Sequence, residues 1–153
     1  MSDTDTLWLE NQLCFALYAA TNAITRSYRS VLEPLGLTYP QYLVLVSLLQ
    51  RPSMTSGELA RALKLDAGTL TPMLKRLSMA GLIERTRRPE DERVIDNQLT
   101  AKGIALQDSL LKAQRDVVYR TGLSNMALEK LRNTLQDLAG NLAHLPEDVL
   151  EPC

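Results

Sequence analysis

The stretch TSGELARALKLDAGTLTPMLKRLSMAGLIERTRRPEDERVIDNQLT, residues 55–100, decides the fold of this chain. It opens with two short segments whose apolar residues lie three or four apart, a spacing typical of amphipathic helices. Thr55 followed by Glu58 has the pattern of a capping box and starts the first helix. After a turn at residues 64–66, Asp66 can cap the second helix, which Gly81 stops. The sequence thus predicts two consecutive helices joined by a tight turn.

The second half of this stretch predicts a β-hairpin. Residues 82–86 and 94–99 are short β-like segments with branched side chains, and the very polar residues 87–93 separate them as a charged tip. Helix, turn, helix and hairpin in this order are the layout of a winged helix-turn-helix, whose second helix can enter the major groove of DNA. We therefore expect a mainly α-helical protein with a winged helix-turn-helix region over residues 36–99.

Pro72 leaves two interpretations of the second helix open. If Asp66 is the N-cap, the proline lies inside the helix and removes one backbone hydrogen bond, which makes the first turn irregular. If Thr71 is the N-cap instead, Pro72 occupies the first helical position, where proline is well tolerated.

Long helical patterns flank the winged region. Residues 7–33 are expected to form one helix, which Pro34 and Gly36 stop. Thr38 with Gln41 predicts a second capping box ahead of a helix that ends near Arg51. Thr100 is placed to cap a further long helix. The final helix has leucines spaced 3, 4, 3, 4, 3, the pattern of helices that pack against helices: Leu128, Leu131, Leu135, Leu138, Leu142 and Leu145. Residues 146–153 are expected to form a tail.

Composition narrows the class of protein. The chain has 153 residues and 45% hydrophobic content, enough for one folded core. Its first six residues are acidic and polar, and no apolar run approaches membrane-spanning length, so we expect a cytoplasmic protein without a membrane partner. Cys14 and Cys153 do not predict a structural disulfide in that compartment, and His144 has no partners for a metal site. No metal or other cofactor is expected.

Basic charge is concentrated where the fold would meet DNA. Between Lys64 and Arg88, six basic residues oppose two acidic ones, a net +4 within a chain whose net charge is -1. We expect base or phosphate contacts from the second helix and phosphate contacts from the hairpin, with Arg93 oriented by Asp91 in the minor groove. The candidate DNA-binding residues are Thr69, Thr71, Lys75, Arg76, Arg87, Arg88, Asp91 and Arg93. The plainer interpretation of each single charge is a solvated surface.

Several strings resemble the MarR family of transcriptional regulators over nearly the whole chain. Asp91-Glu92-Arg93 matches the Asp-x-Arg of the family's wing, and Leu99-Thr100 followed by Gly103 matches the segment after it. Within the family, three strings are similar to the organic hydroperoxide sensors of the OhrR type: residues 12–18, residues 36–42 and residues 68–72. Asp96 and Asn97 make the second wing strand more polar than is usual in the family.

This resemblance implies a function and a site. It implies a homodimer held by helices in residues 7–35 and 100–145, which represses transcription from a pseudo-palindromic DNA operator. It also implies that Cys14 is a peroxide-reactive thiol, that Tyr28 and Tyr39 assist it, and that oxidation to a sulfenic acid releases the DNA. From its neighbours alone, Cys14 is better explained as a small buried hydrophobe in the middle of the first helix.

Helix geometry limits how these residues can meet. Tyr28 lies fourteen residues after Cys14, about 21 Å along a continuous helix, so any contact between them must come from the other subunit. Tyr39 stands at the start of the second helix, whose dipole would favour a thiolate. Ordinary interface packing is the simpler role for both tyrosines, and Tyr18 and Tyr42 are expected to line the core or a pocket.

Other assignments stay open at this stage. Cys153 is either a possible second thiol that reaches Cys14 of the other subunit or, more simply, a harmless terminal thiol. The main alternative function is a MarR-type repressor controlled by a small phenolic or drug-like ligand, with Cys14 only packing. A thiol peroxidase enzyme is a further alternative, but the arginine and threonine arrangement of a peroxide-reducing enzyme is not evident, so no enzyme is expected.

Overall fold

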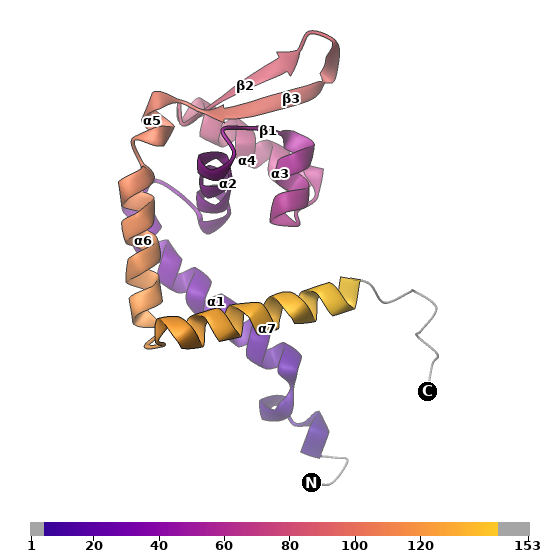
Figure 1. Ribbon diagram of the computed structural model, residues 1–153, viewed down its shortest axis with the longest axis vertical. Helices are drawn as coiled ribbons and strands as arrows, with labels where there is room; N and C mark the ends of the chain where they lie inside the picture. The colour runs from indigo at the N-terminus through magenta and orange to yellow at the C-terminus, as the bar shows by residue number, and fades with distance from the viewer. Residues whose placement is uncertain (1–4, 144–153) are drawn as a thin grey trace, which may run out of the picture. The chain divides into compact units, whose positions relative to one another are not determined.

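A computed structural model describes residues 5–143 and contains one three-stranded antiparallel sheet and seven α-helices in that part of the chain (Figure 1). The chain forms two compact units with a boundary between Val117 and Val118, and each is described by itself below. Among residues 5–143, no helix is long and apolar enough to cross a membrane.

The first long helix is shorter than the sequence predicted. Two 3-10 turns, η1 (Asp5–Leu7) and η2 (Leu9–Asn11), precede α1 (Leu13–Leu32), and a third, η3 (Glu33–Leu35), ends at Gly36 with φ +69°. The expected single helix over residues 7–33 is therefore wrong at its start, because Trp8 and Gln12 have extended backbones that interrupt it. Cys14 consequently lies in the first turn of α1, not in the middle of a helix.

Helix α2 (Tyr39–Gln50) is the centre of the first unit. Its predicted capping box is confirmed, since the Thr38 N–H donates to Gln41 Oε1 at 2.9 Å and the Gln41 N–H donates to Thr38 Oγ1 at 3.4 Å. Its side chains are apolar on nearly every side. Its Val44, Leu45 and Leu48 are buried in a core with residues of α1, α3 and α4: Leu32, Leu59, Leu70, Leu74 and Leu77.

The helix-turn-helix follows as predicted. Thr55 caps α3 (Ser56–Leu63) with Glu58 in a second capping box, and Lys64 turns the chain with φ +54°. Asp66 accepts the N–H of Thr69 at 2.8 Å and so caps α4 (Ala67–Met79). Asp66 is thus the N-cap, and Pro72 lies inside the helix.

Pro72 is tolerated because of the side of α4 on which it lies. Its missing N–H would have bonded the carbonyl of Gly68, and both residues are exposed, so water can satisfy that oxygen. The opposite side carries Leu70, Leu74 and Leu77, all buried.

The wing is a larger sheet than predicted. The order is β1-β3-β2, with β2 (Ile83–Arg88) and β3 (Asp91–Leu99) forming the hairpin drawn in Figure 1. The strands continue past the predicted bounds through most of residues 87–93, so the tip is only residues 89–90. A short strand, β1 (Ser53–Thr55), also pairs with β3 and was not predicted, because three residues carry too little pattern to identify a strand.

The predicted long helix after Thr100 is two helices. Thr100 Oγ1 accepts the N–H of Gly103 and caps α5 (Ala101–Ile104), and α6 (Gln107–Arg120) follows. The break occurs because Leu106 donates to the carbonyl of Gly103, a tighter i→i−3 bond that ends the α-helical pattern. Buried residues of α6 belong to the first unit: Leu110, Ala113 and Val117.

The second unit contains α7 (Asn125–Ala143), which confirms the predicted last helix. No described residue of α7 is buried. Leu131, Leu135 and Leu142 of the leucine pattern are instead exposed. His144, Leu145, the predicted tail and Cys153 lie outside the described residues.

Gly103 gives a test of this packing. A Cβ at this position would overlap the backbone carbonyl oxygen of Leu82, whereas a Cβ at Gly57 would meet only Thr55 Oγ1 at 3.9 Å. We expect Gly103→Ala to lower the free energy of unfolding by about 1–3 kcal/mol, as other overpacked sites do. Urea denaturation at fixed protein concentration measures this loss. Gly57→Ala is the control, expected to be neutral or stabilising by about 0.5 kcal/mol, and equal behaviour of the two variants would contradict the packing described.

Candidate nucleic-acid interface and redox site

The exposed side of α4 carries the residues predicted to read DNA. At 100° per residue, Lys75 and Arg76 lie opposite the buried leucines, with Thr71 on one flank and Thr69 on the other. Lys75 and Arg76 are exposed and Thr71 is half-buried. The four side chains therefore share the outward half of one helix, the arrangement that a recognition helix requires.

Thr69 has a second role within the chain. Its hydroxyl donates to Asp66 Oδ2 at 2.7 Å while its N–H donates to Oδ1. These two hydrogen bonds hold the pKa of Asp66 below its usual value, and the bond from the Thr69 hydroxyl has the larger effect. The Thr69 hydroxyl is therefore held at the start of α4 with its lone pairs available and its proton engaged.

The arginines of the wing differ in what holds them. Arg88 forms a two-pronged ion pair with Asp96, at 2.7 Å from Nε and 2.9 Å from Nη2, and this pair lowers the pKa of Asp96. Arg87 donates to the backbone carbonyl of Glu92 at 3.4 Å. The Asp91 carboxylate accepts the backbone N–H of Arg93 at 3.1 Å, so it orders the strand beside Arg93 while the exposed guanidinium extends from it.

A buried polar residue that the site prediction missed holds the wing to the helices. Asn97 is 0% exposed and donates through its amide to the Met54 carbonyl, at 3.1 Å, and to Ser56 Oγ, at 3.2 Å. Its side-chain oxygen accepts from Arg85 Nε at 3.3 Å. The unusual polarity of residues 96–97 was the available signal. It is explained by these bonds and by the ion pair of Asp96.

The two tyrosines predicted to assist the thiol lie together. The ring centroids of Tyr28, on α1, and Tyr39, on α2, are 4.7 Å apart. Burial is the main cause that raises the pKa of both phenols, so both stay protonated at neutral pH. Tyr42 completes a cluster, with centroid distances of 5.2 Å to Tyr28 and 5.9 Å to Tyr39.

Cys14 is not part of this cluster within one chain. It is exposed at the second position of α1, and α1 is continuous from Leu13 to Leu32. The helical rise separates Cys14 from Tyr28 by about 21 Å. Tyr18, one turn further along α1, is 64% exposed and therefore not a core residue of the chain, whereas Tyr42 is buried as expected.

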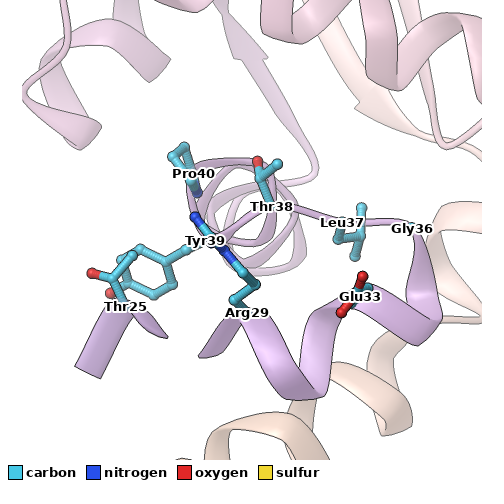
Figure 2. Close-up of a pocket in the computed structure, with 8 residues that line it drawn as sticks. All are labelled: Thr25, Arg29, Glu33, Gly36, Leu37, Thr38, Tyr39 and Pro40. Atoms are coloured by element: carbon cyan, nitrogen blue, oxygen red, sulfur yellow. The ribbon is translucent and has the colours of Figure 1, made fainter. Parts of the chain in front are cut away.

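A pocket of about 350 Å³ lies beside Tyr39, where α1 and η3 face the start of α2 (Figure 2). Thr25, Arg29 and Glu33 line one wall, and Figure 2 shows the Arg29 guanidinium pointing toward the first turn of α2. The opposite wall is residues 36–40. Its mixture of hydroxyl, charged and apolar groups suits a small organic molecule with a polar end.

Comparisons with known proteins agree with this geometry. Residues 37–95 match the model of the MarR family. The chain is 40% identical over 138 residues to an organic hydroperoxide resistance transcriptional regulator of Bacillus subtilis (strain 168), covering 90% of this chain and 94% of the relative.

Two solved structures of the protein AbfR are also similar. Reduced AbfR bound to DNA is 32% identical with a TM-score of 0.78, over 94% of this chain and 98% of that one. Disulfide-formed AbfR is 34% identical with a TM-score of 0.64, over 89% and 96% of the two chains.

The winged fold, the exposed recognition helix and these matches define a DNA-binding transcriptional regulator. The chain belongs to the MarR family.

Arg93 tests the wing as a DNA contact. Because its guanidinium is exposed on β3, Arg93→Ala should weaken operator binding by about tenfold or more. The slope of the logarithm of the binding constant against the logarithm of salt concentration should also fall by roughly one charge contact. Titration of a labelled operator at several salt concentrations measures both quantities. Lys112→Ala removes one exposed charge from α6 and serves as the control. An unchanged affinity of Arg93→Ala at physiological salt would show that the wing is assigned wrongly.

Proposed function

We propose that this chain is a homodimeric repressor that binds a pseudo-palindromic operator and leaves it when an organic hydroperoxide oxidises Cys14. The observation that carries the proposal is the Tyr28–Tyr39 pair, two protonated phenols with ring centroids 4.7 Å apart, together with the exposed Cys14 thiol, which lies about 21 Å from Tyr28 along α1. The name of the Bacillus subtilis relative, an organic hydroperoxide resistance regulator, supports the same reaction.

The chemistry needs only the thiol and the peroxide. The Cys14 thiolate attacks the outer peroxide oxygen, the S–O bond forms as the O–O bond breaks, and the products are a sulfenic acid and an alkoxide. The alkoxide takes up the proton that the thiol lost and leaves as an alcohol. Sulfur is oxidised by two electrons and the peroxide is reduced by two. Because the thiol is consumed once, the proposed role is that of a sensor and not of an enzyme.

The proposed site contains residues of two chains. Cys14 of one subunit would approach Tyr28 and Tyr39 of the other, whose hydroxyls can donate hydrogen bonds to the thiolate. The first turn of α1 adds a favourable dipole, because negative charge is stabilised at a helix N-terminus. The exposed apolar side chains near Cys14 support such an approach, since a second copy would cover them: Leu7, Trp8, Leu9, Leu13 and Phe15.

The release of DNA follows from the position of α2. Tyr39 lies in its first turn, while its buried Leu45 and Leu48 belong to the core shared with α3 and α4. A rearrangement at the tyrosines can therefore shift the recognition helices away from the spacing that the operator requires. Since DNA is the ligand, we place the protein in the cytoplasm.

A second candidate function is a repressor controlled by a small organic ligand. The pocket beside Tyr39 favours it, because an occupant would contact the same helices α1 and α2 without any change at Cys14. The two candidates differ in whether induction needs the thiol.

Replacement of Cys14 separates them. We expect stoichiometric organic hydroperoxide to convert Cys14 to a sulfenic acid and release the operator, while Cys14→Ser stays bound under the same oxidant. Mass spectrometry and a DNA-binding titration on the same sample measure the two events. Equal release from Cys14→Ser would reject thiol sensing and favour the ligand-controlled repressor.

The tyrosines are tested in the same assay. Tyr28→Phe and Tyr39→Phe should each slow oxidation at least tenfold, because a hydrogen bond to a charged group contributes about 1.5–3 kcal/mol. Tyr119→Phe, at an 88% exposed position, is the matched control.

The leucines of α7 test the dimer. Leu128, Leu131 and Leu135 line an apolar groove on α7, so a second copy can bury them. Leu135→Asp should leave monomers or misfolded protein, because a charge would lie unpaired in the interface. Sedimentation measures the mass, and Thr134→Asp places the same charge on the neighbouring exposed residue as a control. If Leu135→Asp remains a stable dimer, the interface lies elsewhere.

A further inference from the structure

The Thr69 hydroxyl, at the start of α4, can accept a hydrogen bond from a ligand but has no proton left to give. That proton is donated to Asp66 Oδ2 at 2.7 Å, and the Thr69 N–H donates to Asp66 Oδ1 at 2.8 Å. Asp66 is an ionised carboxylate at neutral pH and has no proton of its own to return. The Asp66–Thr69 pair therefore offers only lone pairs to a further partner.

The residue between them keeps this arrangement open and accessible. A Cβ at Gly68 would lie 3.0 Å from Asp66 Oδ1, tighter than ordinary van der Waals contact, so a larger residue would push the carboxylate aside. Asp66 and Thr69 are both exposed, and a ligand can reach the hydroxyl oxygen. Thr69 is on the same flank of α4 as Arg76, two helical turns earlier.

A hydroxyl that only accepts is restricted in what it can bind on DNA. The phosphates and deoxyriboses within a strand carry acceptors and no N–H or O–H donor, so they cannot satisfy it. In the major groove the donors are the amino groups at N6 of adenine and N4 of cytosine. The N-terminal residues of a recognition helix contact base edges, and Thr69 is in the first turn of α4.

We infer that Thr69 is a specificity-determining residue, whose hydroxyl oxygen accepts a hydrogen bond from the amino group of an adenine or a cytosine while Asp66 holds its proton. The inference rests on the DNA-binding part of the proposed function and does not involve Cys14. Without Asp66, the same hydroxyl could instead donate to a phosphate or a base carbonyl. Asp66 is thus the positioning residue that removes those choices.

Operators that lack single amino groups test this inference. An operator is first selected from random DNA duplexes with the unmodified protein. Within one half-site, each adenine is then replaced in turn by purine and each cytosine by 2-pyrimidinone, which deletes only the amino group. We expect deletion at one position to weaken binding about 2- to 10-fold at fixed salt, the effect of one neutral hydrogen bond.

Variants identify the residue that reads this amino group. Thr69→Val removes the oxygen and should bind the parent and amino-deleted operators equally, within about twofold, whereas Thr69→Ser should restore the difference. Asp66→Asn still caps α4 but can donate to the hydroxyl, so it should also reduce the difference. The matched control is Thr134→Val, at an exposed threonine of α7 whose hydroxyl donates to a backbone carbonyl, and it should keep the difference.

Two results would overturn the inference. One is that no amino deletion weakens binding more in the unmodified protein than in Thr69→Val. The other is a fall of the salt slope by a full contact in Thr69→Val, which would place the hydroxyl on a phosphate. Melting temperature checks the fold of each variant, and if Thr69→Val does not fold, an undiminished difference in Asp66→Asn overturns the inference instead.

The same experiment separates this inference from the proposed function. If the unmodified protein selects no sequence from the random duplexes, the proposed operator binding fails. If it selects one and the amino deletions have no effect that depends on Thr69, only the role of Thr69 fails.

Discussion

Helix α2 is apolar on almost all sides, and the other helices of the first unit pack around it and bury it. Val44, Leu45 and Leu48 are at most 1% exposed on one side of the helix. Leu43, Val46 and Leu49, on its other sides, are partly buried against the same core, so α2 has neighbours around most of its circumference. Different parts of α2 contact different parts of the unit. Its first turn carries Tyr39 and Tyr42, and its buried side chains share one core with the helix-turn-helix. Since packed cores transmit displacement rather than absorb it, the proposed function requires that a disturbance of the tyrosines reach the helix-turn-helix through this core.

The unbroken length of α1 imposes the second constraint. A helix cannot bring two of its own residues together when fourteen positions separate them, so Cys14 and Tyr28 serve one site only if two chains supply it. The exposure of Cys14 and of the apolar residues beside it agrees with this division. Such a site would exist only in the assembled protein, which would make the thiol's chemistry dependent on the same contacts that bring two winged regions to one operator.

Local signals made most of the fold predictable. The capping boxes at Thr38 and Thr55 and the caps at Asp66 and Thr100 appear where the sequence indicated, because a cap needs only neighbouring residues. β1 was missed because its pairing depends on β3, more than forty residues away. The wing strands were predicted too short because their ends lie in the charged residues 87–93, which have no apolar alternation. For the site, the sequence identified Tyr28 and Tyr39 through resemblance. The role of Asn97 depends on neighbours that only the folded chain brings together.

The strand order β1-β3-β2 leaves two sheet edges with unpaired backbone groups. Such edges can recruit a strand from another molecule and begin aggregation. Here one edge is only three residues long and the other carries Arg85, Arg87 and Arg88. Two copies of that edge would repel each other along its length, whereas a polyanion would not. The arginines of β2 thus oppose edge-to-edge pairing of the free protein, before any nucleic acid is present.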